Sequence, residues 1–380
     1  MGPGSHQLRT HRRLTSSTPA GGLRPTVAAT EPGSHPEAIR DHVINETEAK
    51  GAVMRAIVAS RPGGPEVLEI IETAEPDVRP GEVKIRVRAF GLNKAESYYR
   101  SGNYGIFRSD LALGYEAVGE VVEDSNGVLA VGQRVATAMG GMMITRHGGY
   151  ADYISVDAKN VVPIDSLLAF EELAALPEAY LTVWGALEKS LRIVDGQTLL
   201  VRGATSSVGM AAVAYAKMRG LNVLATTRQS EATEKLISIG ADHVVIDDGE
   251  IRDQVRAINQ QGVDHAIEVV GAATLLDTAS CIRPWGEVVV VGLLAGPPVL
   301  SNLNLMMDIP NTVKLSFFNS QLLGTEALPL TDSPLDLIAE QVASGRMPSA
   351  LAKVYPFDDI QEAHRLLDSG RAGGKIVVRS

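Results

Sequence analysis

A glycine-rich loop carries the clearest chemical signal in the sequence. The apolar segment 198–202 runs directly into Gly203-Ala-Thr-Ser-Ser-Val-Gly209, and an alanine-rich stretch follows at 210–219. Where a strand turns into a helix in this way, the first backbone amides of the helix lack partners and the helix dipole adds positive charge, so the loop binds phosphate. We therefore predict that a dinucleotide pyrophosphate binds here. The expected contact residues are Gly203, Ala204, Ser206, Ser207, Val208 and Gly209.

The neighbouring residues indicate which nucleotide this loop binds. A P-loop needs a lysine after its last glycine, and this chain has Met210. An NAD site usually ends its second strand on a carboxylate for the ribose 2′-hydroxyl, whereas the strand here ends Ala225-Thr-Thr-Arg228. Arg228 offers a planar donor fork for a 2′-phosphate, and Thr227 adds a hydroxyl. We predict NADPH as the cofactor; the alternative is that Arg228 is a solvated surface residue.

The elements around the loop alternate between apolar strands and helix-length segments. Strands are expected at 199–201, 223–225, 244–246, 266–269 and 288–291, and helices near 208–219, 231–239, 251–260 and 273–282. This alternation predicts a doubly wound parallel sheet, an α/β fold of the Rossmann type. Ligands bind beyond the carboxyl ends of the strands in such sheets, so we expect Gly292 and Leu293 to present backbone groups to the nicotinamide carboxamide.

The segments on either side of this sheet have a different composition. Residues 54–166 hold short valine- and isoleucine-rich runs separated by glycine and proline, which predicts a compact antiparallel β domain. Residues 1–53 show no persistent hydrophobic period, and we predict a disordered tail or tag there, with a transit peptide as the alternative. We divide the remainder into a first β-rich part at 54–177, a nucleotide-binding domain at 178–318 and a second β-rich part at 319–380.

Composition narrows the class of protein. The chain has 380 residues, 45% of them hydrophobic, which is enough for two or three domains with large cores. Its only cysteine, Cys281, permits no intrachain disulfide, so we expect a reducing compartment and predict the cytoplasm. The formal net charge of −10 argues against nucleic acid as a partner. The longest uncharged run, 288–307, is interrupted by glycine, proline and asparagine and is expected to be strand and loop rather than a membrane span.

Taken together, the ordered motifs resemble those of the zinc-free medium-chain dehydrogenase/reductases, close to quinone oxidoreductases. The similarity covers the chain from Met54 to its end. Besides the glycine loop, it rests on Gly91-Leu-Asn-Lys-Ala-Glu96, Gly114-Tyr-Glu-Ala-Val-Gly119, Gly132-Gln-Arg-Val135, Gly148-Gly-Tyr-Ala-Asp-Tyr153, Leu176-Pro177, Leu181-Thr182, Gly240-Ala-Asp242, Gly262-Val-Asp264 and Gly373-Gly-Lys-Ile-Val-Val378. The resemblance implies a Rossmann doubly wound sheet inserted into a GroES-like, β-rich catalytic domain.

The resemblance also bears on metal binding and on the glycine loop. Zinc members of the family carry a cysteine where this chain has Asn93 and a histidine where it has Tyr115, and the cysteine cluster for structural zinc is absent as well. We therefore predict no metal. Many relatives have a glycine where the loop has Ser206, and a hydroxyl of Ser206 or Ser207 is a candidate donor to the phosphate.

Without zinc as a Lewis acid, the substrate must be easily reduced or its oxygen must meet hydrogen-bond donors, which favours quinones and α,β-unsaturated carbonyls. Tyr104 resembles the pocket tyrosine of quinone oxidoreductases and is the expected donor, with packing of a loop as its alternative role. Asn93 is the second candidate catalytic residue, and Glu96 is expected to orient its neighbours. Thr182 matches the family threonine beside the nicotinamide.

Two alternatives to an NADPH-dependent quinone or enone reductase remain open. One is a 2-enoyl thioester reductase of the same fold, and the other is a low-turnover NADPH-binding protein, used as a crystallin or an adaptor. For assembly, the β-prone segment 312–318 predicts an exposed edge strand that pairs with its copy in a homodimer.

Overall fold

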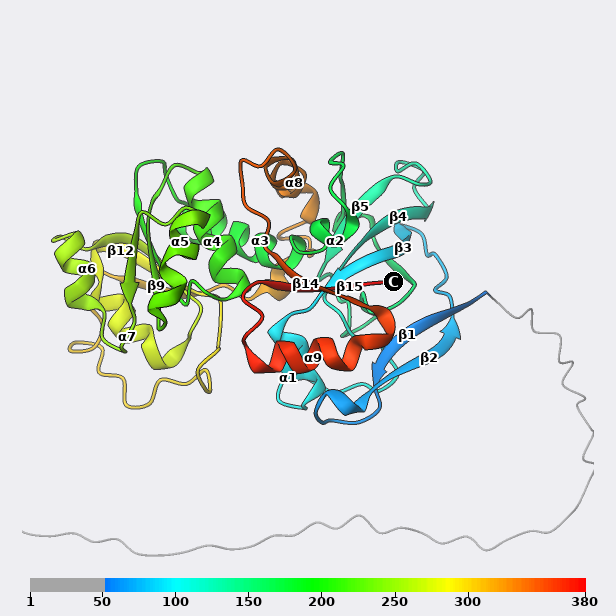
Figure 1. Cartoon of the computed structure of the whole chain (residues 1–380), viewed down its shortest axis with the longest axis horizontal. Helices are drawn as coiled ribbons and strands as arrows, with labels where there is room; N and C mark the ends of the chain where they lie inside the picture. Colours follow the sequence, from blue (N-terminus) through cyan, green and yellow to red (C-terminus); the bar gives the residue numbers. More distant parts are fainter. Residues whose placement is uncertain (1–51) are drawn as a thin grey trace, which may run out of the picture. The chain divides into compact units, whose positions relative to one another are not determined.

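A computed structural model describes residues 52–380 (Figure 1). The predicted tail, 1–53, falls outside the described residues except for its last two positions, and the first strand, β1, begins at Val53. No described helix is both long and apolar enough to cross a lipid bilayer.

The nucleotide-binding domain is built on a six-stranded sheet in the order β10-β9-β8-β11-β12-β13. All neighbouring strands in it are parallel, which is the arrangement that the alternating sequence pattern predicts. The doubly wound fold is thus confirmed. Its strands are β8 (Thr198–Arg202), β9 (Asn222–Thr227), β10 (His243–Ile246), β11 (Val263–Glu268), β12 (Ile282–Val290) and β13 (Lys314–Phe317).

Helices cover both faces of this sheet, as a parallel sheet requires. α4 and α5 pack against each other on one side, and α6 and α7 do so on the other (Figure 1). Their bounds are α4 (Ser207–Met218), α5 (Thr233–Ile239), α6 (Arg252–Ile258) and α7 (Ala272–Ser280).

The second sheet has seven strands in the path β14-β15-β3-β4-β5-β7, with β6 paired to β3. The last strand of the chain lies antiparallel to β3, with Val377 opposite Gly91, so the nucleotide-binding segment is inserted within the sequence of the β-rich domain. The strands are β3 (Glu82–Gly91), β4 (Glu116–Asp124), β5 (Arg134–Ala138), β6 (Tyr153–Asp157), β7 (Val161–Pro163), β14 (Leu351–Pro356) and β15 (Lys375–Arg379), and a separate hairpin is formed by β1 (Val53–Ala59) and β2 (Leu68–Ala74).

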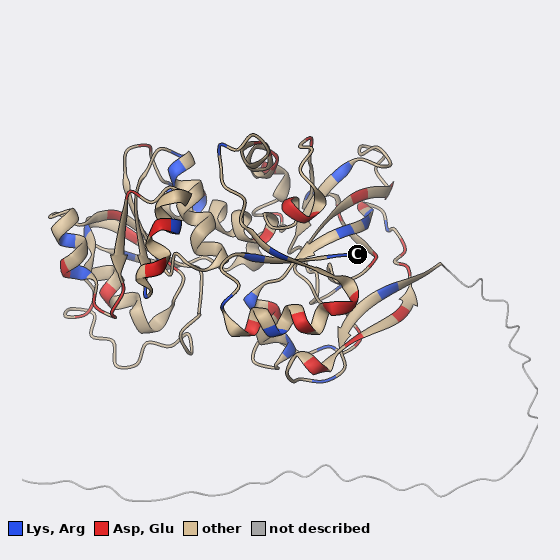
Figure 2. Ribbon diagram, viewed as in Figure 1, with Lys and Arg blue, Asp and Glu red and all other residues tan. Residues whose placement is uncertain are grey.

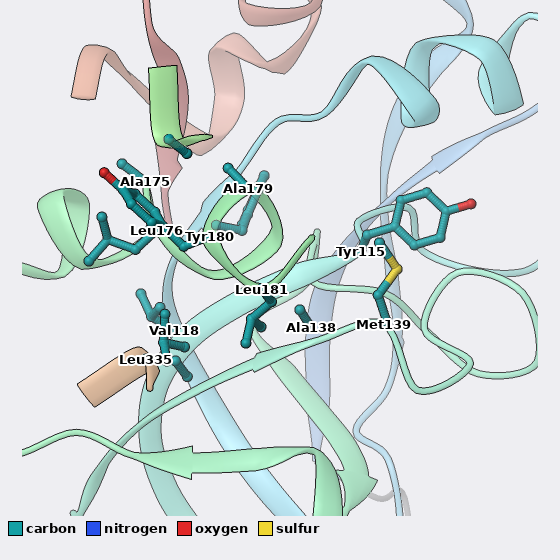
Figure 3. Close-up of a cluster of buried hydrophobic side chains, with 14 of the residues drawn as sticks. Tyr115, Val118, Ala138, Met139, Ala175, Leu176, Ala179, Tyr180, Leu181 and Leu335 are labelled. Atoms are coloured by element: carbon teal, nitrogen blue, oxygen red, sulfur yellow. The ribbon is translucent and has the colours of Figure 1, made fainter. Parts of the chain in front are cut away.

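One buried helix, α3 (Pro177–Trp184), packs against α4 and contacts strands of the β-rich sheet. Every residue of α3 is buried, which is expected of a helix that is apolar on all sides, and Figure 3 shows Leu181 and Ala179 within the packed cluster. A π-helical segment, η3 (Gly185–Leu191), continues it. The other helices are α1 (Lys94–Arg100), α2 (Phe170–Leu173), α8 (Leu335–Ala343) and α9 (Ile360–Ser369), and single 3₁₀ turns lie at 65–67, 158–160, 230–232, 320–322, 330–332 and 357–359.

Charged side chains of both signs are interspersed along the surface elements. Figure 2 shows basic and acidic residues on the same helix in α9, and a basic residue on β1 beside acidic residues on β2.

Candidate active site

The glycine loop has the geometry that a close pyrophosphate contact needs. Gly203 has a φ of +82°, in the region that favours glycine. A Cβ on Gly209 would lie 2.3 Å from the carbonyl oxygen of Gly203, so only glycine allows α4 to start this close to β8. Both glycines are therefore required by the backbone of the loop itself.

Ser206 holds the loop together. It is the N-cap of α4: its hydroxyl accepts a hydrogen bond from the Gly209 amide at 3.0 Å and donates to the Gly203 carbonyl at 2.9 Å. Because its only hydroxyl proton is used within the loop, the Ser206 side chain is not a free donor to the phosphate, which corrects that expectation. The backbone amides of Ser207 and Val208 have no acceptor among residues 52–380 and are the donors left for an anion.

The end of β9 carries the second predicted nucleotide contact. Arg228 is exposed, and in the described part of the chain its guanidinium has no ion-pair partner. The Thr227 hydroxyl, in contrast, is buried and bonds to the backbone of Gln229, where it shapes the turn. Arg228 is thus available to a ligand, whereas Thr227 supports the loop.

A buried arginine that no sequence motif singles out lies at the end of β8. Arg202 has no exposed surface and forms two hydrogen bonds of 2.9 Å with Asp247 and one of 2.5 Å with Asp277. Asp247 follows β10, so Arg202 links the ends of β8 and β10. These contacts lower the pKa of Asp247 against the opposing effect of burial.

Asn93 lies at the start of α1 in a buried cluster of charged groups. Its amide oxygen accepts from the Lys375 ammonium, and its amide nitrogen donates to Glu116 at 2.9 Å and to Glu96 at 3.2 Å. The side chain therefore has no donor left for a substrate. In this arrangement Asn93 holds Lys375, Glu116 and Glu96 together, and its predicted action on a substrate stays a prediction.

Glu96 orients its neighbours, as expected. Its carboxylate accepts from the backbone amides of Asn93 at 2.6 Å and Tyr115 at 2.9 Å and from the hydroxyl of Tyr150 at 2.7 Å. Burial raises the pKa of Glu96 to about 7, against the lowering effect of these hydrogen bonds.

The hydrogen-bond network continues from Tyr150 to the surface. Arg100 donates to Nδ1 of His364 at 2.8 Å, so the neutral ring carries its proton on Nε2, which lies 3.1 Å from the Tyr150 hydroxyl. Arg100 also pairs with Asp368 at 2.7 Å. No sequence motif pointed to this arrangement, because Arg100 and His364 are 264 positions apart.

Glu178 connects the charged cluster to the predicted nicotinamide side of the site. Its backbone amide donates to Glu116 at 2.8 Å, and its carboxylate accepts from the Thr182 hydroxyl, one helical turn later, at 3.3 Å. Burial raises the pKa of Glu178. The sequence signal that identifies it is a lone acidic residue in an otherwise apolar helix.

Two tyrosines lie near this cluster. Tyr104 is 36% exposed, and its hydroxyl accepts a hydrogen bond of 2.8 Å from Gln321. Tyr115 is buried, and its hydroxyl has no hydrogen-bond partner among the described residues.

On the nucleotide-binding domain, Gly292 and Leu293 follow β12, and the Leu293 carbonyl accepts from Tyr98 of α1 at 3.3 Å. The structure thus connects the loop after β12 directly to α1.

The described residues contain no group of three or more His, Cys, Asp or Glu side chains arranged to hold a metal ion. His147 is half-buried, and its Nδ1 accepts from the Ala112 amide at 3.1 Å. Burial lowers the pKa of His147. Its ring thus supports the loop before β4.

Comparison with known proteins shows which proteins this chain resembles. The profile "Alcohol dehydrogenase GroES-like domain" matches residues 79–166, and the profile "Zinc-binding dehydrogenase" matches residues 207–332. The chain is 29% identical over 342 residues to the quinone oxidoreductase of Homo sapiens, covering 86% of this chain and 98% of that protein. It is also 29% identical over 339 residues to the quinone oxidoreductase of Mus musculus, again covering 86% of this chain and 98% of that protein.

Solved structures agree with this similarity. The quinone oxidoreductase of Pseudomonas syringae superposes with a TM-score of 0.74 at 26% identity, covering 86% of this chain and all of that one. The Escherichia coli quinone oxidoreductase, solved in complex with NADPH, shares the fold with a TM-score of 0.75 at 24% identity, over 87% of this chain and all of that one. The chain is therefore similar to the medium-chain dehydrogenase/reductases, and it shares the GroES-like and Rossmann domains of the quinone oxidoreductases.

Proposed function

We propose that the protein is an NADPH-dependent reductase that transfers a hydride to quinones or α,β-unsaturated carbonyl compounds without a metal. The observation that carries the cofactor assignment is the pairing of a loop that has two unsatisfied amides with an exposed arginine at the end of β9. The relatives named quinone oxidoreductase support the substrate class.

The residues present fit the cofactor. Its pyrophosphate is assigned to the amides of Ser207 and Val208 over the Gly203–Gly209 turn, and its 2′-phosphate to Arg228. Bound NADPH supplies the hydride, and the protein supplies binding, orientation and electrostatics. Thr182 and the backbone of Gly292 and Leu293 are assigned to the nicotinamide end.

Tyr104 is assigned to the substrate. Its exposed phenol, steadied by Gln321, is in a position to donate to an oxygen that gains negative charge when the substrate is reduced. Burial of the ring raises the pKa of Tyr104, which keeps the hydroxyl protonated at neutral pH.

The direct test is oxidation of NADPH, followed by its absorbance, after addition of a simple quinone, a simple enone and a 2-enoyl thioester in turn. Rapid turnover with the first two supports the proposal. Turnover with the thioester alone indicates a 2-enoyl thioester reductase. Tight NADPH binding without turnover indicates a binding protein of the crystallin or adaptor kind.

We further propose that the protein is a cytoplasmic homodimer. β13 forms one edge of the parallel sheet, and within the described residues no strand pairs with its outer side. Phe317 on this strand is 56% exposed, and a copy of the strand paired with β13 would cover part of it. The single, buried cysteine is consistent with a reducing compartment.

A further inference from the structure

Tyr115 is a buried tyrosine whose hydroxyl is unsatisfied. The residue is 3% exposed, and no described residue pairs with its hydroxyl. Two other buried tyrosines differ: Tyr99 accepts from the Arg108 amide, and Tyr215 lies 3.1 Å from the Glu188 carboxylate. An unsatisfied buried hydroxyl is destabilising, so a ligand atom that accepted its hydrogen bond would remove this cost.

Hydrogen bonds on both sides hold the backbone of Tyr115 in place. The Tyr115 amide donates to Glu96 at 2.9 Å, and its carbonyl accepts from the Met139 amide at 2.7 Å. The residue on one side, Gly114, has a φ of +106° and leaves no room for a Cβ beside Tyr150. On the other side, Glu116 is part of the ion pair with Lys375. The point in the backbone from which the Tyr115 ring projects is therefore fixed.

The ring of Tyr115 belongs to the hydrophobic core, but its hydroxyl points out of that cluster. Figure 3 shows it pointing away from the packed side chains of Leu181 and Ala138. Burial is the main reason that the pKa of Tyr115 is raised. The nearby ionisable groups of Tyr104, Glu96, Tyr99 and Glu178 raise it further by charge repulsion. The Tyr115 phenol thus lies near Tyr104, assigned to the substrate, and Glu178, which bonds to Thr182 on the nicotinamide side.

We propose that the Tyr115 hydroxyl is a catalytic hydrogen-bond donor that receives the carbonyl or quinone oxygen of the substrate. This assignment rests on the proposed reductase function and adds a second phenol to Tyr104. In the balanced reaction the substrate gains a hydride from NADPH and a proton from solvent, and NADP⁺ is released. Tyr115 keeps its own proton and stabilises the oxygen that becomes negative.

The test uses 4-nitrophenolate, whose ring-bound oxyanion imitates the reduced substrate, and measures its binding by absorbance with NADP⁺ present and absent. Tyr115→Phe is expected to weaken this binding about tenfold or more, because it removes a charge-assisted hydrogen bond. Its melting temperature is expected to stay the same or rise, because no intramolecular hydrogen bond is lost. Tyr115→Leu, which removes the same hydroxyl, provides a second test of the binding.

Tyr215→Phe is the matched control, because it removes a buried hydroxyl that does have a partner. It is expected to lower the melting temperature and to leave 4-nitrophenolate binding unchanged. Equal 4-nitrophenolate affinity in wild type and both Tyr115 variants, or no binding to the wild type, would overturn the role of Tyr115 even if quinones are turned over. Hydroxyl-dependent binding without any NADPH oxidation would retain Tyr115 as an oxyanion donor and reject the proposed reductase.

Discussion

The ammonium group of Lys375 lies 2.6 Å from the carboxylate of Glu116, and neither side chain has any exposed surface. The same ammonium group donates to Asn93 and is 4.0 Å from Glu178. One cation thus faces several buried acceptors that come from β4, the start of α1 and α3. It holds together the elements from which the site is built.

Removing this cation is expected to leave buried carboxylates uncompensated. Lys375→Met should lower the free energy of unfolding by about 3 to 5 kcal/mol, the usual cost of breaking a buried pair on one side. Urea unfolding measures the change, and Lys353→Met, at an exposed position of β14, is the control, with an expected change below about 1 kcal/mol. Similar values for the two variants would mean that the buried pair adds no stability.

His364 is expected to make the protein sensitive to acid. Burial and then Arg100 lower its pKa from 6.5 to about 3. The unfolded chain therefore binds one more proton than the folded chain between these values, and the free energy of unfolding falls as the pH drops from 6.5 towards 3. His364→Gln should reduce this slope by up to about 1.4 kcal/mol per pH unit. Unfolding curves of the wild type and the variant across this range measure the difference in slope, and equal slopes would show that His364 does not cause it.

Arg228 is expected to select the cofactor. Arg228→Ala should weaken NADPH binding about tenfold or more while leaving NADH almost unaffected, because only NADPH carries the phosphate. Titration calorimetry with both nucleotides measures this. If the wild type binds NADH as tightly as NADPH, the assignment is wrong.

The Tyr104 hydroxyl is expected to accelerate enone reduction more than quinone reduction. Tyr104→Phe should slow enone reduction about tenfold and quinone reduction less, since an enolate concentrates charge that a hydroquinone anion delocalises. The measurement is kcat/KM for one enone and one quinone. Unchanged rates with both would assign Tyr104 to loop packing.

The edge of the parallel sheet is expected to form the dimer interface. Because the Phe318 amide bonds inward to Val290, the amide of Phe317 faces the open side of β13. Phe317→Pro should therefore dissociate the dimer, and Phe317→Leu should not. Light scattering decides between the 40.3 kDa chain mass and twice that value. A wild type that is already monomeric would exclude this interface.

Local patterns predict the nucleotide-binding domain well. The alternation of apolar strands and helix-length segments identifies β8 to β12, and the glycine loop is found because Gly203 and Gly209 are required by backbone geometry within one short segment. Local sequence patterns could not predict the surroundings of Asn93 and Tyr115. Asn93 is occupied by Lys375, which is 282 positions away, and the partnerless hydroxyl of Tyr115 becomes apparent only when every neighbour is placed.

The position of β15 has a consequence for the order of folding during synthesis. Residues 198–317 contain all six strands of the parallel sheet, so this sheet can form while the chain is still growing. The β-rich domain cannot be completed at that stage, because β15, which pairs with β3 and carries the Lys375 partner of Glu116, is synthesised last. A nascent chain interrupted before β15 would therefore contain the complete parallel sheet and an incomplete β-rich domain in which Glu116 lacks its ammonium partner. We expect such an incompletely folded chain to be a substrate for proteases.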